Sequence, residues 1–227
     1  MSSSSHKILL EPDRLWSPGD AASRSGWAVL VEAERIVDAG PRETFAGLAD
    51  VERIALPGAT LIPGLIEAHA HLFLHPYNET SWDDQVLKEA EAYRTLRAAV
   101  HARATLEAGF TALRDLGTEG AGYADVALRR AIDEGLIAGP RLFLATRAIV
   151  AAHSYGPAAR HYRPDCCVPQ GAQEASGTEE IVRAVRAQAA RGADWIKLYA
   201  DYRTGPAGDV RPTFSEAELR AAVEAAH

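Results

Sequence analysis

Hydrophobic positions divide the chain into a first part of short strand-like runs and a second part in which strand and helix patterns alternate. In the first part, turn signals at Pro18-Gly19 and Gly40-Pro41 separate the apolar runs. These runs are Ile8 to Leu10, Ala28 to Val31, Arg35 to Val37 and Val51 to Ala55. The pattern predicts a small β-sheet module over residues 1–57, which we expect to be part of a composite β-sandwich.

Residues 58–227 follow the rhythm of an α/β domain. Apolar runs of strand length alternate with segments whose apolar residues recur at helical spacing, and this order predicts parallel strands joined by crossover helices. Ser215 and Glu218 form a capping-box pattern that begins one more helix. The expected strands end at His71 or cover 111–116, 141–145 and 195–199, and the expected helices cover 83–108, 123–134 and 178–191.

Two histidines at the end of the first of these strands are the strongest chemical signal in the chain. In a strand, His69 and His71 lie on the same face, so both imidazoles can reach one metal ion. An isolated pair with this spacing is more often a surface or core feature. Here the pair ends the apolar stretch Leu61 to Ile66, and barrel enzymes place their catalytic residues where a strand meets a loop.

Composition favours small-molecule chemistry. The 227 residues are 47% hydrophobic and 24% charged, as in an ordinary globular protein, with a formal net charge of -7. This acidic balance argues against nucleic acid or an anionic membrane as partner, since both require a concentrated basic surface. The N-terminus lacks the pattern of a secretory signal, so we expect a cytoplasmic protein. Adjacent Cys166 and Cys167 are expected to be reduced loop residues.

The motif around the two histidines resembles the first-strand signature of the amidohydrolase superfamily. Three later segments agree with it in order and spacing: Gly109 to Gly117, Gly139 to Leu142, and Ala193 to Tyr199. Together they resemble the imidazolonepropionase-like and Xaa-Pro dipeptidase-like branch. The resemblance implies an α/β fold, the N-terminal part of a (β/α)8 barrel preceded by the β-sandwich segment, and it implies that His69 and His71 are metal ligands.

The resemblance also assigns roles to two residues that spacing alone leaves open. It implies that Lys197 is carboxylated and bridges two divalent metal ions, with zinc expected and manganese, cobalt or iron as alternatives. Without the resemblance, Lys197 is an ordinary lysine whose side chain either extends its charge to solvent or forms an ion pair. His153 resembles a loop histidine that contacts substrate, although Ala151 and Ala152 replace the usual glycines and a plain loop role stays open. Asp115 could orient a ligand or serve as a structural hydrogen-bonding group.

The expected function is hydrolysis of carbon-nitrogen bonds in a small substrate by metal-activated hydroxide. A dipeptide or N-acyl amino acid fits better than imidazolonepropionate, because the lysine implies a two-metal centre. The chain stops at His227, after about half of the units of a barrel. We therefore expect an N-terminal half that needs the remaining strands for catalysis, and a homo-oligomer is possible. The alternative is a truncated, non-catalytic fragment or a metal-binding interaction protein.

Overall fold

The computed structural model describes residues 6–157, 161–204 and 207–227 and divides into two compact units, Met1–Gly64 and Leu65–His227. The boundary predicted at residues 57/58 is placed later in the structure. Strand β5 (Glu52–Leu61) passes through that point and stays paired with β1 (Lys7–Leu15). Because these backbone hydrogen bonds continue to Leu61, the first unit extends to Gly64.

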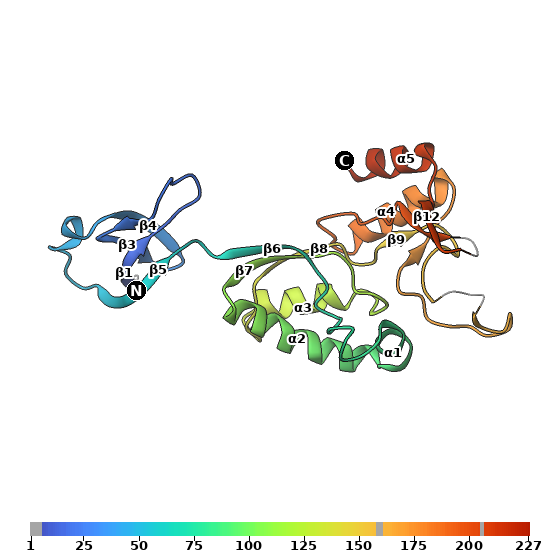
Figure 1. The fold of residues 1–227 in the computed structure, drawn as a ribbon, viewed down its shortest axis with the longest axis horizontal. Helices are drawn as coiled ribbons and strands as arrows, with labels where there is room; N and C mark the ends of the chain where they lie inside the picture. The colour runs from blue at the N-terminus through green and yellow to red at the C-terminus, as the bar shows by residue number, and fades with distance from the viewer. Residues whose placement is uncertain (1–5, 158–160, 205–206) are drawn as a thin grey trace. The chain divides into compact units, whose positions relative to one another are not determined.

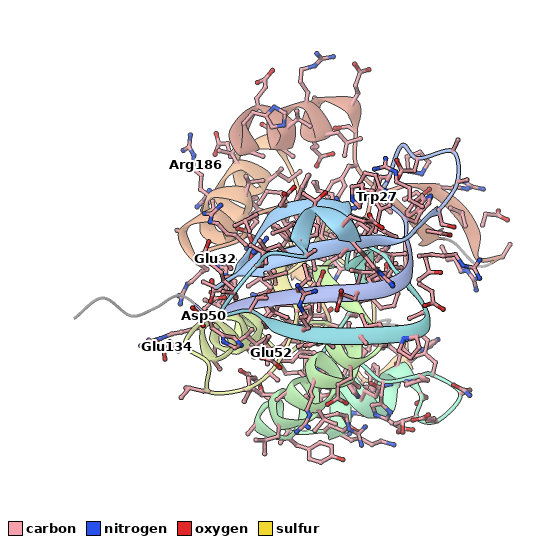
Figure 2. All side chains as sticks on the ribbon, turned by 90° about the vertical axis from the view of Figure 1, so that its left-hand side faces the viewer. Trp27, Glu32, Asp50, Glu52, Glu134 and Arg186 are labelled. Carbon is pink, nitrogen blue, oxygen red and sulfur yellow. The ribbon has the colours of Figure 1, made fainter. Side chains whose placement is uncertain are left out.

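The first unit is built on a five-stranded sheet of order β2-β1-β3-β4, with β5 parallel to β1 and the other pairs antiparallel. Figure 2 looks onto this sheet, and Glu32 and Glu52 lie at the same end of it, as their pairing opposite Lys7 and Ile8 requires. Its buried core is Leu9, Ala28, Leu30 and Phe45. The remaining elements are β2 (Arg24–Ser25), β3 (Trp27–Glu32), β4 (Arg35–Pro41) and the 3-10 helix η1 (Arg42–Phe45).

The second unit begins with three parallel strands in the order β6-β7-β8, which confirms the expected α/β class. Helices α2 (Glu91–Glu107) and α3 (Ala124–Asp133) connect them and lie on the same face of the sheet (Figure 1). Apolar side chains of these helices and strands form one core, which includes Ala98, Leu113, Leu128 and Leu142. The strands are β6 (Leu65–Ala70), β7 (Phe110–Asp115) and β8 (Arg141–Leu144).

The single helix expected over residues 83–108 is wrong, because the chain forms α1 (Trp82–Lys88) and then α2. Glu89 and Ala90 between them are extended, with ψ of 128° and 143°. The Glu89 carboxylate lies 3.3 Å from His75 Nε2 and 3.7 Å from an Arg97 nitrogen. These inward contacts hold Glu89 in the extended conformation, while the apolar spacing continues through both helices and conceals the break.

The chain after β8 is less regular than expected. Strand β9 (Ile149–Val150) pairs in parallel with β10 (Gln173–Glu174), and α4 (Thr178–Ala190) follows. The strand predicted at 195–199 is reduced to one parallel bridge between Leu198 and Ile149. At its start, the Asp194 carboxylate accepts from the Leu144 N–H at 2.8 Å, so a side chain replaces a backbone partner there.

The last segment contains a hairpin that the hydrophobic pattern did not reveal, β11 (Asp201–Thr204) and β12 (Asp209–Pro212), followed by α5 (Glu216–Ala226). The predicted capping box is confirmed: the Ser215 side chain and Glu218 each accept from the other's backbone N–H. Helices α4 and α5 pack around a second buried cluster that includes Ile149, Ile181 and Phe214. None of the described helices combines the length and apolar character needed to cross a membrane.

Candidate metal centre

His69 and His71 lie at the carboxyl end of β6, with their ring centroids 5.5 Å apart. His71 Nδ1 donates a hydrogen bond of 2.9 Å to the carbonyl oxygen of Gly117, the second residue after β7. This bond fixes the tautomer and the ring plane, and it leaves Nε2 of His71 as the lone-pair donor. Metal-binding histidines in proteins are usually held in this way.

Asp115, the last residue of β7, fixes the backbone on both sides of that hydrogen bond. It is fully buried, and its two carboxyl oxygens accept from the backbone N–H groups of Leu72 and Gly117, each at 3.1 Å. Leu72 follows His71 directly, and Gly117 carries the carbonyl that His71 binds. Burial, followed by the charge of Asp125, raises the pKa of Asp115 to about 8 against these two hydrogen bonds. Asp115 therefore has the structural hydrogen-bonding role foreseen for it, at a place that also orients His71.

The electrostatic surroundings of His69 favour its neutral form. Partial burial lowers the pKa of His69, and the positive charges of Lys197, His71 and Arg114 lower it further. A neutral imidazole is the form that binds a metal ion.

Lys197 is half-buried, and its Nζ lies 5.1 Å from the centre of the Tyr199 ring. Burial lowers the pKa of Lys197; the negative charge of Glu119 acts in the opposite direction and the positive charge of Arg114 in the same direction. The net lowering increases the fraction of neutral amine, which is the form that can react with carbon dioxide. The ion-paired lysine considered from spacing alone is not what the structure describes, because no carboxylate lies in salt-bridge distance of Nζ among the described residues.

His153 does not share a hydrogen-bond partner with His69, His71 or Lys197 among the described residues. Its backbone N–H donates to Glu174 Oε1 at 2.8 Å, and its ring Nδ1 lies 4.0 Å from the same oxygen. The side chain is 81% exposed. His153 itself takes the left-handed conformation with φ of 58°, whereas Ala151 and Ala152, which replace the family's glycines, do not. The loop thus bends at the histidine and ties it to β10.

Glu119 is a site residue that the sequence did not indicate. It follows β7 by four residues, is 3% exposed, and accepts side-chain hydrogen bonds from Trp82, Tyr155 and Tyr199. Burial, and then the charge of Glu119, raises the pKa of both tyrosines, so both remain protonated donors. The available signal was a carboxylate between Gly117 and Gly120, directly after a strand end. Tyr199, two residues beyond Lys197, belongs to this network.

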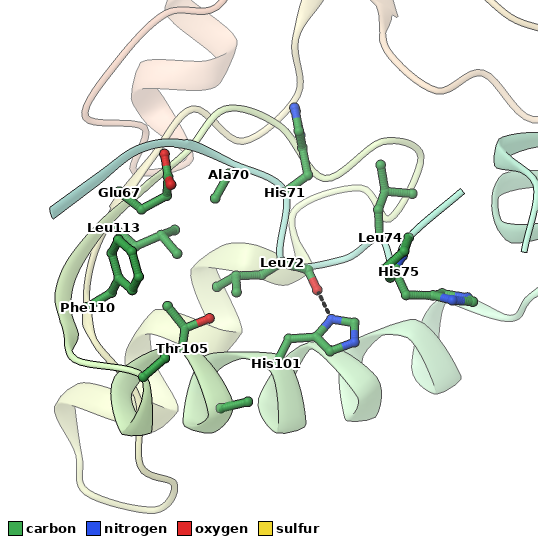
Figure 3. Close-up of a pocket in the computed structure, with 13 residues that line it drawn as sticks. Glu67, Ala70, His71, Leu72, Leu74, His75, His101, Thr105, Phe110 and Leu113 are labelled. Atoms are coloured by element: carbon green, nitrogen blue, oxygen red, sulfur yellow. Dashed lines mark hydrogen bonds between the residues drawn. The ribbon is translucent and has the colours of Figure 1, made fainter. Parts of the chain in front are cut away.

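The cavity drawn in Figure 3 has a volume of about 460 Å³ and lies beside His71, between the end of β6 and α2. Its lining is largely apolar, and His101 Nδ1 donates to the Leu72 carbonyl at 2.8 Å within it. His71 lines this cavity, and its ring projects away from α2 (Figure 3). Because the ring points away from the helix that forms one wall of the cavity, we do not place the chemistry in the cavity.

The donor set suits a divalent metal only with a modified lysine. Among the residues that the structure describes, no group of three or more His, Cys, Asp or Glu side chains is arranged to hold a metal ion. His69 and His71 supply two nitrogen donors, and a carbamate on Lys197 would add oxygen donors. An unmodified ammonium group there would repel the metal.

Comparison with known proteins identifies the family of the chain. A profile of the Amidohydrolase family matches residues 60–227. An uncharacterized protein of Mycobacterium tuberculosis is 28% identical over 172 residues, which cover 75% of this chain and 37% of that protein. The 5-methylthioadenosine/S-adenosylhomocysteine deaminase of Symbiobacterium thermophilum is 43% identical over 53 residues, 23% of this chain and 12% of the deaminase.

Solved structures with a similar fold extend the comparison. A Xaa-Pro dipeptidase with bound methionine has a TM-score of 0.79 at 25% identity, over 97% of this chain and 54% of the dipeptidase. A prolidase complexed with N-methylphosphonate-L-proline has a TM-score of 0.78 at 26% identity, over 96% and 53%. An amidohydrolase has a TM-score of 0.74 at 31% identity, also over 96% and 53%. The chain spans about half the length of these proteins and corresponds to their N-terminal half. The chain belongs to the amidohydrolase family.

Proposed function

We propose that this chain supplies half of the active site of a metal-dependent hydrolase that cleaves carbon-nitrogen bonds in small amides. In this proposal, Leu65–His227 is the first part of a (β/α)8 barrel, and His69, His71 and Lys197 are the metal ligands that it contributes. The observation that carries the proposal is the orientation of His71 by the Gly117 carbonyl, with His69 beside it. The positive charge of Lys197 lowers the pKa of His69, which supports Lys197 as the third ligand. Family membership supports the hydrolase class.

In this proposal, each residue of the site has a separate role in orienting or binding the metal. Asp115 and Gly117 orient His71, and the neutral state favoured at His69 keeps its ring nitrogen available. The ammonium group of Lys197 first loses a proton, and the resulting neutral amine adds to carbon dioxide and releases a second proton, so that a cation becomes an anionic oxygen donor. A divalent metal, zinc by preference, would polarise the amide carbonyl and acidify a water molecule. Manganese, cobalt and iron accept the same donors.

We infer that His153 faces the reacting carbonyl from the loop after β9. Its side chain is exposed, and its ring lies near Glu174 rather than near the proposed metal ligands. We therefore assign it a hydrogen bond to the developing oxyanion. This position in the complete site is a proposal that rests on the loop's place after the third parallel strand. An ordinary loop histidine is the alternative that mutation decides.

For the substrate we propose a dipeptide or an N-acyl amino acid. Similar structures include a Xaa-Pro dipeptidase and the ochratoxinase of A. niger, the latter with a TM-score of 0.72 at 25% identity. Imidazolonepropionate is a weaker candidate, because its hydrolysis does not need the two-metal centre that Lys197 implies. A non-catalytic fragment or a metal-binding interaction protein is the alternative function, and it predicts metal binding without turnover.

Zinc binding tests the proposal directly. Purified chain is dialysed against zinc and bicarbonate, and bound metal is counted for the wild type, His71→Ala and the control His6→Ala. His6 is an exposed histidine of the first unit that pairs with Glu52. We expect zinc to bind to the wild type and the control but not to His71→Ala. Equal zinc in all three proteins would contradict the proposed ligands.

Turnover is the second measurement. Chain loaded with zinc is assayed with dipeptides and N-acyl amino acids, alone and together with the segment that completes the length of its relatives. We expect hydrolysis with the added segment, at a rate typical of enzymes of about 10 per second. Binding of zinc without hydrolysis in either assay would favour the interaction protein.

A further inference from the structure

Glu119 is a buried carboxylate whose bonds reach unusually far along the chain. Its Oε2 accepts from Trp82 Nε1 at 3.0 Å and from the Tyr155 hydroxyl at 2.6 Å, and its Oε1 accepts from the Tyr199 hydroxyl at 2.8 Å. A carboxylate at 3% exposure is stable only when such donors replace water. Because both oxygens are occupied and covered, Glu119 does not contact a substrate, and its effect must pass through its partners.

Two of these partners belong to the two candidate site segments that lack a regular strand. Tyr199 is two residues beyond Lys197, and its ring lies 5.1 Å from Lys197 Nζ. Tyr155 is two residues beyond His153. The rings of Tyr155 and Tyr199 stack with centroids 4.9 Å apart and planes 13° from parallel, so the two segments are also joined to each other.

The acceptor itself is fixed to the framework that carries His71. Glu119 has a φ of 49°, an uncommon conformation for a residue other than glycine, and its carbonyl accepts from Arg94 at 2.8 Å. The Arg94 guanidinium, 2% exposed in α2, also donates to the carbonyls of Thr118 at 3.0 Å and Phe73 at 3.1 Å. Phe73 is two residues after His71, so one buried arginine links the histidine segment to the turn of Glu119.

The third donor is held by close packing. A Cβ atom at Gly171 would lie 2.5 Å from the Trp82 ring, and one at Gly156 would lie 3.0 Å from it. Glycine at both positions therefore lets the loops approach the indole, whose Nε1 points to Glu119. The carboxylate of Glu119 is consequently held from α1 and two loops, and its backbone carbonyl from α2.

We propose that Glu119 is a positioning residue that sets where Lys197 and His153 lie with respect to His69 and His71. This inference rests on the proposed function for its consequence, but the linkage through Tyr199 and Tyr155 is a property of the chain alone. Each tyrosine carries one branch: Tyr199 holds the Lys197 segment, and Tyr155 holds the His153 loop. If Glu119 only stabilised the fold in general, its loss would not act on these two segments more than on the rest of the unit.

Hydrogen exchange resolved by peptide separates these two cases. Removing the hydroxyl in Tyr199→Phe should speed exchange over residues 195–202 about tenfold, because one hydrogen bond to a charged group is lost. Exchange over residues 151–156 should stay within about twofold in this variant. Tyr155→Phe should give the opposite pattern. Glu119→Gln should speed exchange in both segments, because the amide has one acceptor oxygen where the carboxylate has two. Tyr93→Phe, at a surface tyrosine that pairs with Arg97, is the matched control and should change neither.

A second control distinguishes positioning from general stability. Gln188 is also fully buried, and its side chain is hydrogen-bonded to Thr146 and Gln173 rather than to Glu119 or its tyrosine partners. Gln188→Leu should speed exchange over α4, and it should not produce faster exchange confined to residues 151–156 and 195–202. If Glu119→Gln loosens all of residues 65–227 to the same degree, or leaves both segments as in the wild type, the proposal is wrong.

Zinc added to the same samples links the inference to the site. We expect Tyr199→Phe to bind zinc about tenfold more weakly and Tyr155→Phe to bind it normally, since only Tyr199 adjoins a proposed ligand. Equal weakening by Tyr93→Phe would contradict the positioning role. If the wild type binds no zinc, the proposed function fails, whereas the exchange pattern still decides the role of Glu119.

Discussion

The two sides of the candidate site are held by different kinds of interaction. On the histidine side, β6 pairs with β7, and Asp115 binds backbone N–H groups next to His71. On the lysine side, Leu198 makes one parallel bridge to Ile149, and the backbone N–H groups of Asp194 and Trp195 donate to the Leu144 carbonyl at 2.8 and 3.1 Å. Side chains add the links from Tyr199 to Glu119 and from Asp194 to the Leu144 N–H. The first side is therefore fixed by a continuous ladder, and the second by a few backbone hydrogen bonds together with side-chain bonds to distant parts of the sequence.

This difference predicts how each side of the site responds to side-chain substitutions. A strand in a ladder tolerates most side-chain substitutions because its backbone carries the hydrogen bonds. A segment tied by single side chains loses its position with one substitution. We therefore expect variants on the lysine side to act on position and variants at Asp115 to act on the ligand itself.

The largest effect is expected for Lys197→Ala. In the protein completed by the segment that extends it to the length of its relatives, this change removes the proposed anionic bridge, so binding of a second zinc ion should weaken by more than about 100-fold. A short carboxylic acid should partly restore it by replacing the carbamate. Zinc titration in bicarbonate measures both, and Lys88→Ala, at an exposed lysine of α1, is the control. Unchanged binding of two zinc ions would remove Lys197 from the site.

His153→Ala should come next. If the protein hydrolyses amides as proposed, loss of a hydrogen bond to the oxyanion lowers turnover by about 100-fold or more. Bound zinc should stay constant, because His153 bonds to Glu174 rather than to the histidine pair. Metal analysis and steady-state kinetics on the same sample check this. A fall in bound zinc would make His153 a ligand.

Asp115→Asn should have a smaller effect, confined to the histidine side. The asparagine offers one acceptor oxygen to two backbone N–H donors, so the Leu72 or the Gly117 contact is lost and His71 turns. Zinc affinity should fall about 10- to 100-fold, as for other residues that orient a ligand. The control is Asp165→Asn at an exposed carboxylate. Exchange over residues 195–202 should not change, and an increase there would contradict the separation of the two sides.

The smallest effect concerns the dependence of stability on pH. Burial raises the pKa of Asp115 to about 8 from an ordinary value of 3.8, so the folded protein holds this proton and the unfolded chain does not. Stability should be lost as the pH rises from about 4 to about 8, and Asp125, raised to about 6, adds to the loss at the acidic end. Thermal unfolding at pH 6 and pH 9 should differ by several degrees. Asp115→Asn should flatten this difference; an equal difference in the variant would assign it to other groups.

Most strands and helices follow from local sequence because their signals are local. The signals are the apolar runs within β7 and β8 and the capping box at the start of α5. Each lies inside or next to the element that it defines. The failures occur where tertiary contacts override the pattern. Glu89 breaks a continuous helical spacing through its contacts with His75 and Arg97. At Leu144, the Asp194 carboxylate takes the place of a backbone carbonyl as acceptor for the Leu144 N–H.

The sequence by itself determined the α/β class, the family resemblance and the placement of His69 and His71 on one strand, because the period of two in a strand is a property of the backbone. Only the tertiary structure decided how these residues are oriented. The bond from His71 to Gly117 spans 46 positions and that from Tyr199 to Glu119 spans 80, and both depend on how strands from different parts of the chain meet. Glu119 carries no motif of its own, since its role arises from three donors that become neighbours only in the fold.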